Sequence, residues 1–186
     1  MDELKELKER LLHERPQDWE SFPDIGLYMD QIISYMPRQL IHFGDGEVLT
    51  SAMVNNYIKD GMLPRAEGKR YSRPHLAYLT AIMALKQVLS VRSARELIGV
   101  GTSGRNTEEL YGYFTRVLDG ALTETGQALD EDLSEADLPK LALGLALRSY
   151  ADRLACERVL EIMHQRADRD KIREKGKKEG KADHKL

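Results

Sequence analysis

The side chains best suited to bind another molecule gather in one short stretch, where amides alternate with cations. Asn55 and Asn56 stand close to Lys59, and a second basic group follows in residues 65–70. An asparagine amide can form two hydrogen bonds with the edge of an adenine, while lysine and arginine bind phosphate oxygens. These residue types indicate binding of a nucleic acid rather than catalysis.

Charge is segregated along the 186 residues, although the formal net charge is only −3. Residues 50–95 carry eight Lys/Arg and two acids, a balance of +6, whereas residues 1–49 balance at −6 and residues 106–138 at −8. A basic block favours a polyanion because each neutralised phosphate releases counterions. Acidic flanks would confine that contact to one face. The alternative is a chance cluster of Lys and Arg on a solvated surface.

The basic block begins with a short predicted helix. Thr50 is a suitable N-cap, and Gly61 can adopt the positive φ that ends a helix after Asp60. Helical spacing puts four residues on the inner side and four polar residues on the outer arc. The inner residues are Ala52, Val54, Tyr57 and Ile58, and the outer ones are Ser51, Asn55, Asn56 and Lys59. We expect the outer arc to contact base edges in the major groove.

A basic loop and a further helix follow. Residues 65–71 predict a short wing, and Ser72 predicts the N-cap of a helix that tolerates Pro74 in its first turn. We expect the wing to hold the DNA backbone through Arg65, Lys69, Arg70 and Tyr71.

This order of elements resembles the winged helix-turn-helix of MerR-type (mercuric-resistance) regulators. The resemblance rests on Thr50, Val54, Tyr57, Gly61-Met62-Leu63-Pro64, Gly68-Lys69-Arg70-Tyr71, Leu76 and Leu79. It implies a domain that binds double-stranded DNA, in regulators that usually form dimers. Asn55 and Asn56 stand where that family usually has arginine and tyrosine. Residues 22–98 are also similar to a MerR-like bacterial domain family of unknown function.

The remaining chain predicts a mainly α-helical protein. We expect an N-terminal helical segment in residues 1–19, the winged helix-turn-helix in 20–99, a helical region in 100–165 and a basic, disordered tail in 166–186. Asn106 with Glu109 predicts a capped helix, and Ser134 with Asp137 predicts the start of the last one.

The C-terminal helices are expected to form a compact pair that makes the protein a homodimer. Their apolar residues are Leu138, Leu141, Leu145, Leu154 and Met163. The alternative is that these residues form an ordinary core.

Other patterns give weaker signals. Gly99, Gly101 and Gly104 form a GxGxxG, but a predicted helix rather than a strand precedes it, so a linker is favoured over a dinucleotide site. The five histidines show no i, i+4 pair, and Cys156 is the single cysteine, so neither a metal site nor a cofactor is expected. No nucleophile lies beside a base, and an enzyme is therefore not expected.

No apolar run approaches the ~20 residues that span a bilayer, and the N-terminus lacks the apolar core of a signal peptide. These features predict a cytoplasmic protein. The sequence favours a transcriptional regulator that binds specific DNA, and the alternative is a non-catalytic protein-interaction adaptor with the same fold. It specifies neither an operator nor an effector.

Overall fold

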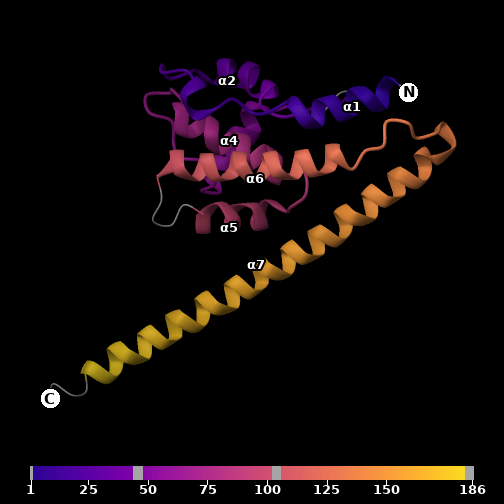
Figure 1. Ribbon diagram of the computed structural model, residues 1–186. Helices are drawn as coiled ribbons and strands as arrows, with labels where there is room; N and C mark the ends of the chain where they lie inside the picture. Colours follow the sequence, from indigo (N-terminus) through magenta and orange to yellow (C-terminus); the bar gives the residue numbers. More distant parts are fainter. Residues whose placement is uncertain (1, 44–47, 102–105, 183–186) are drawn as a thin grey trace. The chain divides into compact units, whose positions relative to one another are not determined.

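The computed structural model describes residues 2–43, 48–101 and 106–182, which form α-helices joined by loops (Figure 1). The α-helices are α1 Asp2–His13, α2 Met29–Tyr35, α3 Ser51–Lys59, α4 Arg73–Leu85, α5 Val91–Gly101, α6 Thr107–Gln127 and α7 Leu138–Ala182. Short 3-10 helices occur at η1 Trp19–Ser21, η2 Met36–Arg38 and η3 Glu135–Asp137. The described residues include no strand, only two isolated antiparallel bridges. The predicted mainly α-helical class is confirmed.

The chain divides into two compact units, residues 1–139 and 140–186. The sequence predicts a boundary near residue 99, but α6 packs against α4 and α1 in the first unit (Figure 1). Tyr111 and Leu129 are buried there, because this part of the chain supplies apolar surface that covers the core. Helix α6 therefore contributes to the core of the first unit.

The core of the first unit centres on α4. Leu76, Leu79 and Ile82 recur at three-residue spacing on its inner side and are almost completely buried. Each such side chain contributes roughly 1.5–3 kcal/mol through removal from water. Other fully buried core side chains are Phe22, Ile32, Met36, Leu49 and Val54.

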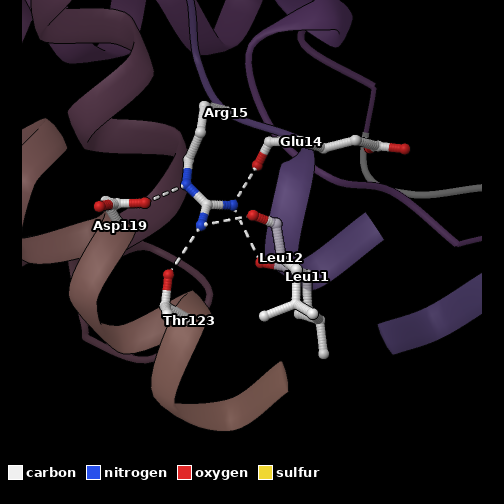
Figure 2. Close-up of polar contacts among 6 residues, drawn as sticks. All are labelled: Leu11, Leu12, Glu14, Arg15, Asp119 and Thr123. Atoms are coloured by element: carbon white, nitrogen blue, oxygen red, sulfur yellow. Dashed lines mark hydrogen bonds and ion pairs between the residues drawn. The ribbon is translucent and has the colours of Figure 1, made fainter. Parts of the chain in front are cut away.

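Arg15 joins the end of α1 to α6, as Figure 2 shows. All five of its guanidinium N–H groups donate to oxygens, three on backbone carbonyls at the end of α1 and two on side chains of α6. The acceptors are Leu11 O (2.9 Å), Leu12 O (3.1 Å), Glu14 O (2.7 Å), Asp119 Oδ1 (2.5 Å) and Thr123 Oγ1 (3.0 Å). Arg15 thus satisfies carbonyls that the end of a helix leaves without partners.

The same two helices approach closely at Gly126. A Cβ added there would lie 2.9 Å from Leu12 Cδ2 and 3.3 Å from Leu11 Cβ. A side chain here would displace Leu12 and crowd Leu11, so glycine allows the backbone of α6 to pack against α1. We call this contact, together with Arg15, the α1–α6 seam.

Helix α7 extends for 45 residues. It continues through residues 166–182, where the sequence predicts a disordered tail. The tail is poor in apolar residues, but it is rich in Lys, Glu, Arg and Ala, which have high helix propensity. None of the helices in the described ranges is long and apolar enough to cross a membrane.

Candidate nucleic-acid interface

Helix α3 presents one polar face to solvent. Ser51, Asn55, Asn56 and Lys59 are all exposed, and we call these four residues the α3 face. At 3.6 residues per turn they lie within an arc of about 140°. Val54 and Tyr57 are buried on the opposite side as predicted, whereas Ala52 is exposed.

Both ends of α3 are fixed by local hydrogen bonds. Thr50 is the N-cap as predicted, and its Oγ1 accepts the Met53 N–H at 3.2 Å. Gly61 has a φ of 70°, and its N–H donates to Ile58 O while Met62 N–H donates to Tyr57 O. This pair of bonds is a Schellman motif, which ends a helix at a defined residue.

The predicted wing contains a tight hairpin turn. Its central residues Gly68 and Lys69 have φ of 56° and 65°, and Glu67 and Arg70 exchange two backbone hydrogen bonds of 3.1 and 2.9 Å. Positive φ at both positions is typical of the type I′ turn. Lys69 lies exposed at the tip, and it is the one non-glycine residue with positive φ among those the structure describes.

The base of the hairpin is paired with the segment before α2. Leu27 and Tyr71 exchange two backbone hydrogen bonds of 2.8 Å each. The Tyr71 side chain is buried with its ring edge against His75, and burial raises the pKa of its hydroxyl. The Tyr71 side chain, which the sequence predicts to hold the DNA backbone, thus lies in the core rather than on the surface of the hairpin. Successive side chains of an extended chain point to opposite sides, so Arg70 is exposed and Tyr71 is not.

The backbone carbonyl of Arg65 accepts a hydrogen bond, while its side chain is exposed. His75 Nδ1 accepts the Ser72 N–H at 3.0 Å, so Nε2 carries the hydrogen that it donates to Arg65 O at 3.2 Å. The buried His75 thus has a structural role and fixes the loop before the hairpin.

Apart from Arg70, the structure divides the cations of the basic block into two groups. Arg73 donates to Phe22 O and pairs with Asp24, Arg92 pairs with Glu96, and Lys86 donates to the Tyr57 hydroxyl. The second group consists of exposed cations whose side chains form no hydrogen bond or ion pair with any residue in the described ranges. Its members are Lys59, Arg65, Lys69 and Arg95.

Sequence reasoning missed Arg95, which lies on α5. Its Nη2 is 3.6 Å from the position of a Cβ added at Gly61, so the guanidinium lies beside the end of α3. A cation is favourable at the C-terminus of a helix. Arg95 therefore adds positive charge at the C-terminal end of α3.

An apolar pocket of about 280 Å³ lies between α4, α5 and α6 of the same unit. Its lining includes Tyr78, Leu85, Leu97, Leu110 and Phe114.

Gly99 and Gly101 of the GxGxxG belong to helix α5, and Gly104 lies outside the described residues. A helix rather than a strand thus leads into this motif, and a dinucleotide site requires a strand there.

The fold and the site define a small, mainly helical domain with a capped, polar helix followed by a basic hairpin. Residues 17–114 match the profile of a family described as a domain of unknown function, DUF1836. The match covers more than half of the chain, so the chain belongs to this family, as the similarity to a family of unknown function predicted. No curated protein and no solved structure matches the chain.

Proposed function

We propose that this protein binds duplex DNA, with the α3 face in the major groove and the hairpin on the backbone. The observation that supports this proposal best is the placement of unpaired cations. The side chains of Lys59, Arg65 and Lys69 are exposed and form no hydrogen bond or ion pair within the described parts of the chain. Phosphate contacts supply much of the affinity for DNA, while amides such as those of Asn55 and Asn56 discriminate bases.

The proposal includes transcription regulation by a MerR-like winged helix-turn-helix, in the cytoplasm and without catalysis. The fixed ends of α3 support it, because a helix of defined length and orientation positions its side chains against a groove. The type I′ turn supports it as well, since it holds Lys69 at a protruding tip.

A homodimer formed through α7 is part of the same proposal. Leu143, Leu147, Tyr150 and Leu154 are exposed on α7 at spacings of four, three and four residues. This spacing places them on one side of the helix, where a second copy of α7 would cover them. A two-fold dimer would read two half-sites. Sedimentation equilibrium of wild type and Leu147→Asp tests this part, and a wild-type monomer would contradict it.

Charge reversal tests DNA binding directly. We expect Lys69→Glu with Arg70→Glu to reduce affinity for a random-sequence duplex at least tenfold, measured by fluorescence anisotropy. Arg116→Glu, an exposed cation of α6 outside the proposed face, is the matched control and leaves affinity nearly unchanged. Equal affinity of all three proteins would contradict the proposal and favour a protein-interaction adaptor.

Base recognition is tested separately by selection from random duplexes. We expect wild type to enrich a sequence motif and Asn55→Ala with Asn56→Ala to lose part of it, while non-specific affinity remains. If the motif is the same for both proteins, the two asparagines do not contact bases.

A further inference from the structure

The segment before α2 lies directly beneath Arg70. A Cβ added at Gly26 would lie 2.8 Å from Arg70 Cβ, 3.4 Å from Cδ and 3.6 Å from Cγ. The aliphatic part of Arg70 therefore rests on the backbone of Gly26, where no side chain fits. The two hydrogen bonds between Leu27 and Tyr71 hold these segments together.

The Tyr28 side chain contacts the guanidinium of Arg70. The guanidinium carbon of Arg70 lies 4.9 Å from the centre of the Tyr28 ring, and Nη2 donates to the Tyr28 hydroxyl at 3.1 Å. This distance is within the range of a cation–π contact. Tyr28 is itself fixed as the N-cap of α2, where its backbone N–H donates to Gln31 Oε1 at 2.8 Å.

The guanidinium of Arg70 retains free donors in this arrangement. An arginine side chain has five N–H donors, and among the described residues the Arg70 guanidinium donates only to Tyr28. The neighbouring Arg73 differs, because its Nε and Nη2 are used by Phe22 O and Asp24. An arginine held on an aromatic ring with free donors is suited to bind two oxygens of one phosphate.

We propose that Tyr28 and Gly26 are positioning residues that hold the Arg70 guanidinium in place for a phosphate of the DNA backbone. This inference rests on the proposed function. It adds a second segment, residues 26–28, to an interface that otherwise consists of α3 and the hairpin. Because Arg70 is already ordered, binding does not have to immobilise a flexible side chain, and affinity is higher.

A double-mutant cycle tests the inference. Affinity for one random-sequence duplex is measured by fluorescence anisotropy for wild type, Tyr28→Leu, Arg70→Ala and the double variant. We expect Tyr28→Leu to weaken binding about threefold to tenfold in wild type but less than twofold in Arg70→Ala. Tyr28→Phe keeps the ring and removes the hydroxyl, so we expect an intermediate loss.

Arg65 provides the matched control, because no ring contact holds its side chain in the described structure. The fold losses in affinity caused by Tyr28→Leu and by Arg65→Ala should multiply in the double variant. If the effects of Tyr28→Leu and Arg70→Ala also multiply, Tyr28 does not act through Arg70 and the inference is overturned. The proposed function fails separately, if Lys69→Ala and Arg70→Ala both leave affinity unchanged.

A measurement on the DNA-free protein tests the inference even if Tyr28→Leu impairs folding. In ¹H–¹⁵N spectra of the free protein, the Arg70 Nε–H signal should be shifted from the position of mobile arginines. We expect Tyr28→Phe to move it toward that position while backbone signals of α4 stay unchanged. A wild-type Arg70 signal at the mobile position would overturn the inference.

Discussion

Arg15 and Arg70 show how differently two arginines of one compact unit are used. Arg15 donates all five N–H groups to oxygens of α1 and α6, whereas Arg70 donates one to Tyr28. The sequence presents both as cations near polar residues, and net charge does not distinguish them. The number of donors already used by the protein separates a cation that holds the fold from one able to bind a ligand.

The same contrast holds for the regions around these two residues. The α1–α6 seam has closed packing at Gly126 and saturated hydrogen bonds at Arg15, so changes there should affect stability. The α3 face and the hairpin carry exposed side chains on a backbone fixed by caps and turns. Changes to those side chains should affect binding and leave the fold intact.

The largest loss of stability is expected for Arg15→Ala. It removes the ion pair with Asp119 and leaves carbonyls at the end of α1 without a donor from the protein. We expect a decrease of about 2–4 kcal/mol in the free energy of unfolding, measured by urea denaturation. A decrease below about 0.5 kcal/mol, as for an ordinary surface arginine, would show that Arg15 does not stabilise the fold and would contradict the contrast with Arg70.

Gly126→Val should destabilise the same seam somewhat less. The added atoms meet Leu12 and Leu11 at distances that force α1 and α6 apart, at a cost of about 1–3 kcal/mol. Gly120→Val is a matched control on the same helix, because a Cβ there meets nothing within 4 Å. Helix propensity favours valine over glycine at both positions, so equal stability of the two variants would contradict tight packing at Gly126.

Tyr111→Phe tests through pH how α6 is held in the same unit. The Tyr111 hydroxyl donates to Gln17 O at 2.7 Å, and burial raises its pKa well above that of an exposed tyrosine. The folded state therefore disfavours ionisation, so this stabilisation is complete below about pH 10 and is lost as pH rises further. We expect Tyr111→Phe to cost about 1 kcal/mol at pH 7 and to flatten the alkaline decline in stability. An alkaline decline identical to that of wild type would contradict this assignment.

Arg70→Ala should have the smallest effect on stability. Its side chain is exposed and makes one hydrogen bond and one ring contact, so we expect less than about 0.5 kcal/mol by the same urea titration. DNA affinity of the same sample should fall. A stability loss similar to that of Arg15→Ala would show that Arg70 is structural.

Local features of the fold could be predicted from the sequence. Thr50 and Asn106 cap their helices as expected, and Gly61 ends α3 with positive φ. Each of these features is decided by residues within about four positions, so the sequence contains the information. The turn at Gly68 is equally local.

Features that depend on distant segments could not be predicted. Arg15 meets residues more than a hundred positions away, and Arg70 meets Tyr28 across 42 positions. Leu27 pairs with Tyr71 across 44 positions and holds its segment extended. The same pairing buries Tyr71. Tertiary contacts thus override the local pattern at the residues that complete the site.

The dependence of duplex binding on salt concentration tests the central claim most directly. If Lys59, Arg65, Lys69 and Arg70 bind phosphates, log Kd rises steeply with log salt, and removing any one of them lowers the slope by about one. We expect this decrease for Lys69→Ala and no decrease for Arg116→Ala. Binding that is insensitive to salt, or a slope unchanged in Lys69→Ala, would contradict the proposed interface.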